Sequence, residues 1–220
     1  MTRRLAALSA FLADALACAL VWSRLPERVA VHWGFHGEPN GWGSRTTAVL
    51  LGPGLIALLF LGLEVFLRVD PKRVAAGRDL EATPGERDGT LDLFIALAFT
   101  LLALLHGVLL LVGAGLLSDP PRAHALILAS FLLVAGNFFG RLRPSWFVGI
   151  RTPWTLSSDE VWRRTHRLAG RLMVPSGLLG IPLALALPGA RSFEVVTVLL
   201  LVSLCGPAVW SYFAWRSREA

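Results

Sequence analysis

Long apolar runs recur along this chain, and their length constrains the fold more than any other feature. A helix needs about 20 predominantly apolar residues to cross the roughly 30 Å hydrocarbon core of a bilayer. Six segments reach or approach that length, over residues 5–22, 48–67, 91–117, 123–139, 158–187 and 193–215. Only 16% of the residues are charged, whereas soluble domains contain about a quarter. The sequence therefore predicts an all-α integral membrane protein, a single membrane domain over residues 1–220 with six transmembrane helices.

The first run has a rival interpretation as a secretory signal peptide, because Arg3 and Arg4 precede its apolar residues. However, the run is long, it contains Asp14, and no small-residue cleavage signal stands at its end. We therefore expect it to be retained as the first transmembrane helix.

Basic residues indicate how the helices are oriented. With six spans, sixteen of the 21 Lys and Arg residues fall on the side that holds both termini, the linker 68–90 and the polar stretch 137–171. Cytoplasmic loops carry the excess of Lys and Arg in membrane proteins. Both termini and residues 137–171 are therefore predicted to be cytoplasmic, and the loop 23–47 external. The net charge of +6 is attributed to this asymmetry and to contact with membrane lipids, and no direct nucleic-acid binding is expected.

The polar stretch between the fourth and fifth apolar runs is rich in Arg and Trp. Residues 137–166 contain five arginines and three tryptophans, more than a simple connection between two helices requires. We interpret residues 149–156 as a turn, because the residue before Pro153 is disfavoured in helical geometry. The next helix is predicted to start at Ser157, whose spacing to Glu160 fits a capping box. A surface loop and a re-entrant segment are both open at this point.

Within this stretch, side chains of different character separate onto different faces. The tryptophans suit the membrane interface: Trp146, Trp154 and Trp162. One face of the following helix would carry Trp162, Thr165, His166 and Ala169, and another Arg163, Arg167 and Arg171. A basic belt against anionic lipid explains the arginines. It leaves the Thr-Pro-Trp-Thr sequence of residues 152–155 and the neighbouring glycines unexplained, because these require a specific backbone shape.

The external loop holds a possible metal site. His32, His36 and Glu38 are all potential zinc ligands. The surrounding glycines and Pro39 argue against a helix, so the four-residue spacing of the two histidines carries no weight. The Pro-Asn-Gly sequence of residues 39–41 is a turn signal. We expect a compact, hairpin-like lid held by buried aromatic side chains, with no metal and no cofactor.

A few polar residues inside the apolar runs need a partner. Asp14 lies in the middle of its run, and a charge there usually faces a partner or a water-filled cavity. Glu64 is near the end of its run and is interpreted as reaching the interface. His106 is interpreted as a neutral, hydrogen-bonded imidazole in preference to a proton relay. Cys18 and Cys205 are expected to be lipid- or core-facing thiols, neither a disulfide nor a metal pair.

Two motifs resemble those of SdpI-type immunity proteins. The first is the signature formed by residues 149–156, GIRTPWTL, followed by Val161-Trp162, Thr165-His166 and Gly170, with Asn137 and the lead-in Pro144-x-x-Phe147-x-Gly149 before it. The second is the external sequence that starts Leu25-Pro26-x-x-Val29 and continues to Trp42. It resembles the domain of unknown function that usually occupies the N-terminal part of these proteins.

The resemblance implies a protein of the bacterial plasma (inner) membrane that protects the cell from a secreted, membrane-active peptide toxin. It also implies a signalling role, in which the toxin-bound protein recruits a small transcriptional repressor, and it implies no enzymatic turnover. We expect the cytoplasmic binding residues to be Asn137, Arg151, Thr152, Pro153, Trp154, Thr155, Trp162, Thr165 and His166. We expect the external ones to be Pro26, His32, Gly37 and Trp42.

Two other classes of function remain as hypotheses. A small-molecule or lipid transporter would have Asp14 and His106 facing a shared hydrated cavity. A membrane-embedded enzyme would need His166, Arg151 and Thr155 to converge on a pocket that holds an anionic headgroup. The sequence contains none of the common hydrolase, zinc-peptidase or phosphate-loop motifs.

Overall fold

The computed structural model describes residues 3–34, 38–69, 89–146 and 148–217. Within these ranges, six helices are long and apolar enough to cross a membrane, which confirms the predicted fold class. They are α1 (Arg3–Val21), α2 (Arg45–Val69), α4 (Gly89–Gly113), α5 (Pro120–Phe139), α7 (Asp159–Ala186) and α8 (Gly189–Arg216). The shorter elements are the 3₁₀ turn η1 (Trp22–Arg24), the strands β1 (Arg28–Trp33) and β2 (Pro39–Ser44), and the short helix α6 (Pro153–Ser157).

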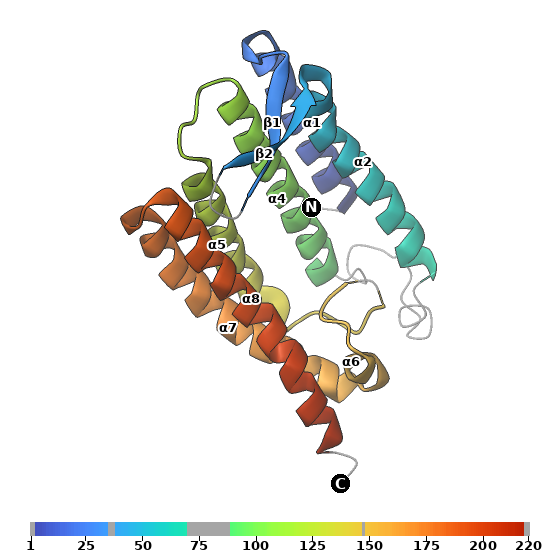
Figure 1. The fold of residues 1–220 in the computed structure, drawn as a ribbon. Helices are drawn as coiled ribbons and strands as arrows, with labels where there is room; N and C mark the ends of the chain where they lie inside the picture. The colour runs from blue at the N-terminus through green and yellow to red at the C-terminus, as the bar shows by residue number, and fades with distance from the viewer. Residues whose placement is uncertain (1–2, 35–37, 70–88, 147, 218–220) are drawn as a thin grey trace.

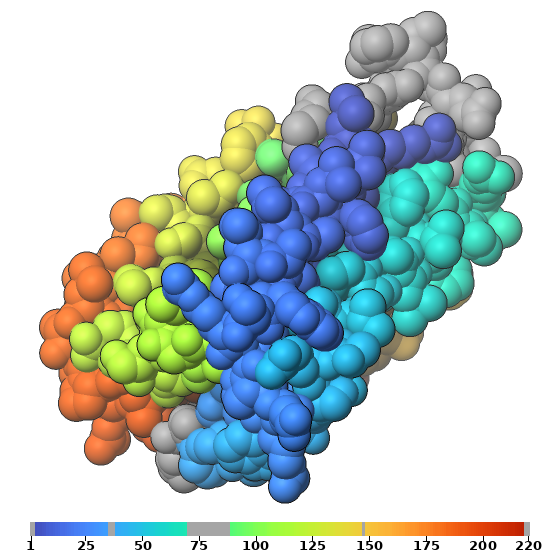
Figure 2. All heavy atoms as spheres, turned by 90° about the horizontal axis from the view of Figure 1, so that it is seen from above, coloured from blue at the N-terminus to red at the C-terminus, as the bar shows by residue number. Residues whose placement is uncertain are grey.

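The six long helices of the described residues form two groups of three (Figure 1). Helices α1, α2 and α4 pack together beside the β1–β2 hairpin, and α5, α7 and α8 form the second group, with α4 and α5 in contact between them. We call the end with the hairpin the hairpin end and the opposite end, with α6, the motif end. In the view from above, the turn after α4 lies between the blue N-terminal third and the orange end of α7 (Figure 2).

Helix α1 shows how one face of an apolar helix is exposed to lipid while the opposite face packs inside the protein. Five leucines are 52–70% exposed and follow one stripe of the helix: Leu5, Leu8, Leu12, Leu16 and Leu20. Small or polar residues fill the opposite, buried face: Ala6, Ala7, Ala10, Asp14 and Cys18. In a membrane the exposed leucines contact lipid, and the small residues let neighbouring helices approach closely.

Helices α5 and α7 approach each other most closely through glycines. A Cβ atom at Gly170 would lie 2.7 Å from the carbonyl oxygen of Gly136, and one at Gly177 would lie 2.5 Å from the backbone nitrogen of Leu133. Backbone atoms cannot yield in the way that the end of a flexible side chain can. Small residues are therefore required along this seam, as is common where transmembrane helices pack.

The observed helix bounds correct several predicted ones. Helix α2 begins at Arg45, three residues before the predicted start at residue 48, and contains Pro53. Helix α4 ends at Gly113, before the predicted end at residue 117. Helix α5 begins at Pro120, because the Asp119 side chain accepts a hydrogen bond from the backbone nitrogen of Arg122 (3.2 Å) and caps it. Helix α8 begins at Gly189, before the predicted start at residue 193. Residues 70–88 of the predicted linker lie outside the described residues.

The predicted hairpin is present, but its turn is not where the sequence placed it. Strands β1 and β2 pair antiparallel, with Trp33 opposite Pro39 and His32 opposite Gly41. The Pro-Asn-Gly sequence therefore lies in β2 and does not form the turn. Trp42 is 54% exposed, so it is not one of the side chains that hold the hairpin from inside. The buried side chains of Leu25 and Val29 anchor the hairpin to the first helix group.

Candidate functional site

The described residues of the connection between α5 and α7, 141–146 and 148–158, form one structured unit at the motif end (Figure 1). Val148 packs against hydrophobic clusters of both helix groups: one built by α1, α2 and α4, the other centred on α5 and α7. The connection therefore contacts both helix groups. It lies at the end of the first group that is away from the hairpin. We call this unit, together with the first two turns of α7, the motif unit.

An aromatic stack forms the centre of the motif unit. The ring of His166 lies between those of Trp162 and Phe139, at centroid distances of 4.1 and 5.1 Å and with interplanar angles of 20° and 18°. Trp162 and His166 are fully buried, and the indole nitrogen of Trp162 donates to the carbonyl oxygen of Leu142 (2.8 Å). Trp162 was expected at the membrane interface, and that prediction is wrong. Its N–H partner lies inside the protein.

Both ring nitrogens of His166 are held by the backbone. Nε2 accepts a hydrogen bond from the backbone nitrogen of Ile150 (3.0 Å), so the hydrogen of a neutral ring is on Nδ1, which donates to the carbonyl oxygen of Trp162 (2.9 Å). Gly149 lies directly over this stack, with a φ of +114°. A Cβ there would come within 2.5 Å of Nε2 of His166 and 2.8 Å of the Trp162 ring. Glycine is required at this position by both its φ and the close approach.

The Thr-Pro-Trp-Thr sequence encodes the start of a short helix. Thr152 caps α6, because its hydroxyl accepts from the backbone nitrogen of Thr155 (3.2 Å), while the Thr155 hydroxyl accepts from the backbone nitrogen of Thr152 (2.8 Å). Pro153 occupies the first helical position, where it is favoured. Part of the predicted turn is therefore helical. The cap of the next helix is Ser158, which accepts from Val161, and not the predicted Ser157.

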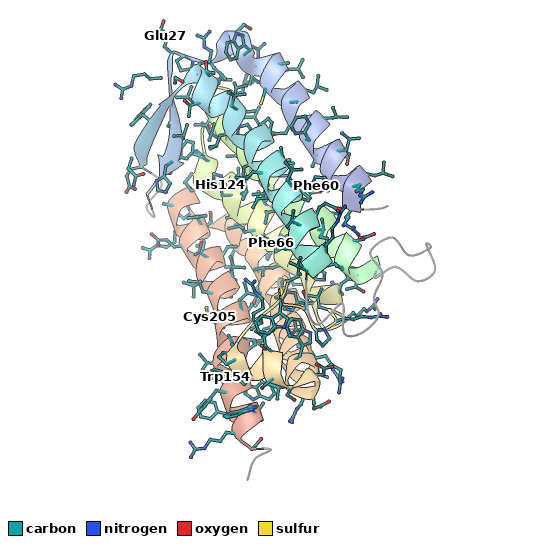
Figure 3. All side chains as sticks on the ribbon, turned by 90° about the vertical axis from the view of Figure 1, so that its right-hand side faces the viewer. Glu27, Phe60, Phe66, His124, Trp154 and Cys205 are labelled. Atoms are coloured by element: carbon teal, nitrogen blue, oxygen red, sulfur yellow. The ribbon has the colours of Figure 1, made fainter. Side chains whose placement is uncertain are left out.

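Helix α6 packs against the end of α8. The indole nitrogen of Trp154 donates to the Ser211 hydroxyl, which also lies 3.1 Å from the Thr152 hydroxyl. The Trp154 ring contacts the ring of Tyr212 edge-to-face, with centroids 5.1 Å apart. Figure 3 shows Trp154 at the motif end, far from Glu27 at the hairpin end. The motif unit is thereby attached to α8 as well as to α5.

Replacing Thr155 with valine is expected to lower the free energy of unfolding by about 1–3 kcal/mol, since it leaves buried backbone groups unpaired. The lost oxygen accepts from Thr152 and donates to the carbonyl oxygen of Ile150 (2.9 Å). Unfolding in mixed detergent micelles, followed by tryptophan fluorescence, measures the change. Thr155→Ser keeps the oxygen and is the control. Equal losses in the two variants would exclude the hydrogen bonds as the cause.

The residues predicted to bind at this end divide into buried and exposed ones. Four are fully buried and build the unit: Thr155, Trp162, Thr165 and His166. Thr152 and Trp154 are partly buried, and Arg151 and Pro153 are exposed. Asn137 is not part of this group, because it is exposed and its side-chain nitrogen donates to Leu133 of its own helix (2.6 Å). Phe147 of the predicted motif lies outside the described residues.

Sequence reasoning missed the partners that complete the unit. Phe139 supplies the second stacking ring, Leu142 supplies the acceptor for Trp162, and Ser211 supplies the acceptor for Trp154. A signal exists only for Ser211, which precedes the aromatic residues Tyr212 and Trp215 at the end of the last apolar run. Phe139 and Leu142 look like any other apolar residues of the sequence.

Asp14 and His106, the two intramembrane polar residues that were singled out, contact each other. Nδ1 of His106 lies 2.7 Å from Oδ1 of Asp14, and Nε2 lies 2.8 Å from the carbonyl oxygen of Ala48. Both side chains are buried. The expectation that Asp14 faces a partner and that His106 is hydrogen-bonded is therefore confirmed, and the two residues join α1 to α4.

Glu64 also has partners, contrary to its interpretation as a side chain that simply reaches the interface. Its carboxylate accepts from Nε of Arg3 (2.7 Å) and from a terminal nitrogen of Arg4 (3.1 Å). Arg3 also lies 3.7 Å from Asp92 of α4. This group ties α1, α2 and α4 together at their ends away from the hairpin.

A cavity of about 440 Å³ lies between the hairpin and the long helices. Its lining comes from β1, α2, α4, α5 and α8 and is mainly apolar. Three histidines are exceptions: His32 of the hairpin, His106 of α4 and His124 of α5. His32 also lies 2.5 Å from the side-chain oxygen of Asn40 across the hairpin. Of the predicted external residues, His32 thus borders the cavity, Trp42 lies on the exposed surface, and Gly37 and His36 lie outside the described residues.

The comparisons with known proteins agree with the two predicted motifs. Residues 141–213, from the motif unit into α8, match the model of the SdpI/YfhL protein family. Residues 10–57, which include the hairpin, match a domain of unknown function, DUF1648. The protein named immunity protein SdpI from Bacillus subtilis (strain 168) is 23% identical over 203 residues, which cover 91% of this chain and 90% of that protein. No solved structure matches the chain. The predicted resemblance is thus confirmed, and the chain is a multi-pass bacterial membrane protein that is similar to the SdpI/YfhL family over residues 141–213.

Proposed function

We propose that this protein confers resistance to a secreted antimicrobial peptide toxin and signals through a small transcriptional repressor that it holds at the membrane. The hairpin end would face the toxin, and the motif end, with both chain termini, would face the cytoplasm. The protein would act by binding, without enzymatic turnover. The name of the Bacillus subtilis relative and the basic residues of the motif end support this proposal.

The observation that carries the proposal is that buried residues of the motif unit fix its backbone, while its arginines are exposed on the surface. Its buried residues fix a single backbone shape through the aromatic stack, the close contact of Gly149 and the capping box. That rigid frame presents a set of exposed arginines: Arg141, Arg143, Arg151, Arg163, Arg164 and Arg167. A basic surface with a fixed shape suits an acidic protein partner, because complementary charge gives orientation and specificity.

Arg151 is the most informative of these arginines. It is exposed, and its guanidinium donates to the carbonyl oxygen of Trp146 (3.2 Å), which holds it against the motif unit. Trp146 is itself 46% exposed. Tryptophan and arginine together are the residue types most enriched at the energetic centres of protein interfaces. We therefore place the centre of the proposed repressor-binding surface at these two residues.

Replacing Arg151 with alanine is expected to abolish protection in cells challenged with the toxin, while the protein stays in the membrane at its normal level. Trp154→Ala should do the same by detaching α6 from α8. Survival of the challenged cells and immunoblots of the membrane fraction are the two measurements. Arg191→Ala is the matched control, since Arg191 is exposed at the start of α8, away from the motif end, and lies 4.0 Å from Glu194 of its own helix. Full protection by the Arg151 variant would contradict the proposal.

The cavity at the hairpin end supports the toxin-facing half of the proposal. Its apolar walls suit the side chains of a membrane-active peptide, and His32 stands at the hairpin side of it. Pro26 and Trp42 belong to the same external segment, before β1 and within β2. The exposed ring of Trp42 suits the lipid interface, where such a peptide arrives.

Transport of a small molecule or lipid is the second candidate, because Asp14 and His106 meet within the helices and His106 lines the cavity. Uptake into reconstituted vesicles that does not change on Asp14→Asn would remove it. The membrane-enzyme hypothesis has no comparable support. His166 has both ring nitrogens bound by the backbone and is fully buried, so it cannot serve as an acid or base in this arrangement.

A further inference from the structure

Three potential metal ligands meet between α1 and α4, away from the motif unit. Asp14 and Cys18 lie one turn apart on α1 and face His106 of α4, and all three are buried, with exposures of 2%, 4% and 5%. One ligand atom from each lies within 4.8 Å of the others. We propose that these residues bind a divalent transition metal ion of the zinc class, through the Asp14 carboxylate, the Cys18 sulfur and Nδ1 of His106. The proposal goes beyond the proposed function and does not depend on it.

The hydrogen bonds of His106 orient the ring as a metal ligand. A carbonyl oxygen only accepts, so the contact of Nε2 with Ala48 (2.8 Å) places a hydrogen on Nε2. In the neutral ring Nδ1 then carries a lone pair, and it faces Oδ1 of Asp14 at 2.7 Å. Two acceptors this close need either a shared proton or a metal ion between or beside them. Metal-binding histidines commonly donate their other N–H to a backbone carbonyl in this way.

The second carboxylate oxygen of Asp14 gives an independent indication. The Asp14 side chain is 1% exposed, and no hydrogen-bond partner for Oδ2 is found among the residues that the structure describes. An unsatisfied carboxylate oxygen is costly in a membrane interior. A metal ion coordinated by Asp14 would satisfy it.

The spacing of the three ligands suits a small tetrahedral ion after modest movement. Zinc bonds of about 2.0–2.3 Å place neighbouring ligand atoms roughly 3.3–3.8 Å apart. The 2.7 Å between Nδ1 of His106 and Oδ1 of Asp14 is shorter than this range, and all three ligand atoms lie within 4.8 Å of one another. Cys18 would exchange its contact with the carbonyl oxygen of Val49 (3.3 Å) for the metal.

The exchange of protons for metal is balanced in charge. Without metal, the site holds one proton shared by Asp14 and His106 and one proton on the Cys18 thiol. A divalent ion would replace both, and the carboxylate and the thiolate would neutralise its charge. Net neutrality matters here, because a buried uncompensated charge in a membrane costs several kcal/mol.

The cavity offers the ion a route to the site. His106 lines it together with His32 of β1 and His124 of α5. Gly52, another lining residue, packs directly on the ligands. A Cβ at Gly52 would lie 2.1 Å from Nδ1 of His106 and 2.3 Å from Oδ2 of Asp14. Only glycine leaves this part of the site open.

Cobalt(II) binding to the purified full-length protein in detergent tests the proposal. After removal of metals with a chelator, we expect one Co²⁺ per chain, with the visible bands of tetrahedral cobalt and a near-ultraviolet thiolate-to-cobalt band. Cys18→Ser, which preserves size, should abolish the thiolate band and weaken binding at least tenfold. Asp14→Asn should weaken binding similarly, and Zn²⁺ should displace the cobalt.

Cys205→Ser is the matched control, because Cys205 is the exposed cysteine, and it should bind cobalt as the unmodified protein does. Thermal unfolding of each variant without metal shows whether it is folded. Binding that is unchanged by Cys18→Ser in a folded variant, or a thiolate band that disappears with Cys205→Ser, would overturn the proposal. So would the absence of binding to the unmodified protein, which would leave the pair holding a proton only.

Discussion

Replacing Trp162 with alanine is expected to lower the free energy of unfolding by about 3–5 kcal/mol, as for other fully buried aromatic side chains. Trp162 is 0% exposed, stacks on His166 at 4.1 Å and donates to Leu142 (2.8 Å). The substitution leaves a cavity, and it also leaves the carbonyl oxygen of Leu142 without its donor. The motif unit should lose its fixed shape before the helices separate, because the stack is its centre. Denaturant titration in mixed micelles measures the loss.

The control for this prediction is Trp146→Ala in the same connection. Trp146 is 46% exposed, so its removal should cost less than about 1 kcal/mol. Limited proteolysis separates the two variants further, since cleavage should appear between α5 and α7 only in the Trp162 variant. Similar stability losses from both substitutions would show that the aromatic stack does not organise the connection.

The helices could be predicted because each one appears in the sequence as a long run of apolar residues. Each apolar run must be long enough to cross a bilayer, and the observed α1 and α7 agree with the predicted runs 5–22 and 158–187 within a few residues. Helix ends depend on single side chains, and these were harder to predict. Ser157 and Ser158 are both plausible caps in the sequence, and only the structure shows that Ser158 makes the bond.

The region of the candidate site could be predicted from the sequence, but the positions and contacts of its individual side chains could not. The density of Arg and Trp pointed to residues 137–171, the part of the chain in which the structure has the motif unit. However, sequence composition does not distinguish a tryptophan at a lipid interface from one buried inside the protein, so Trp162 was misplaced. In the same way, Asp14 and His106 were recognised separately as needing partners. Their pairing across 92 residues is a property of how α1 packs on α4, which no local pattern encodes.

Replacing Gly177 with alanine is expected to destabilise the protein by more than about 3 kcal/mol, at or above the upper end of the usual cost of overpacking. The added methyl group would lie 2.5 Å from the backbone nitrogen of Leu133 and 2.6 Å from the carbonyl oxygen of Ala129. Both atoms belong to the backbone of α5, so the whole helix must move. Because α5 and α7 also hold the motif unit between them, separation of the helices should remove the stack of His166 on Phe139.

Gly206→Ala is the matched control, in helix α8 of the same helix group. No atom lies within 4 Å of a Cβ built there, so alanine should be neutral or stabilise the protein by up to about 1 kcal/mol through its helix propensity and the smaller entropy of its unfolded chain. The same chemical change should therefore have opposite signs at two helical glycines. Thermal unfolding and size-exclusion profiles of the two variants measure it. Equal effects would mean that helix propensity, and not the close approach of α5 and α7, decides the cost of losing a glycine in this bundle.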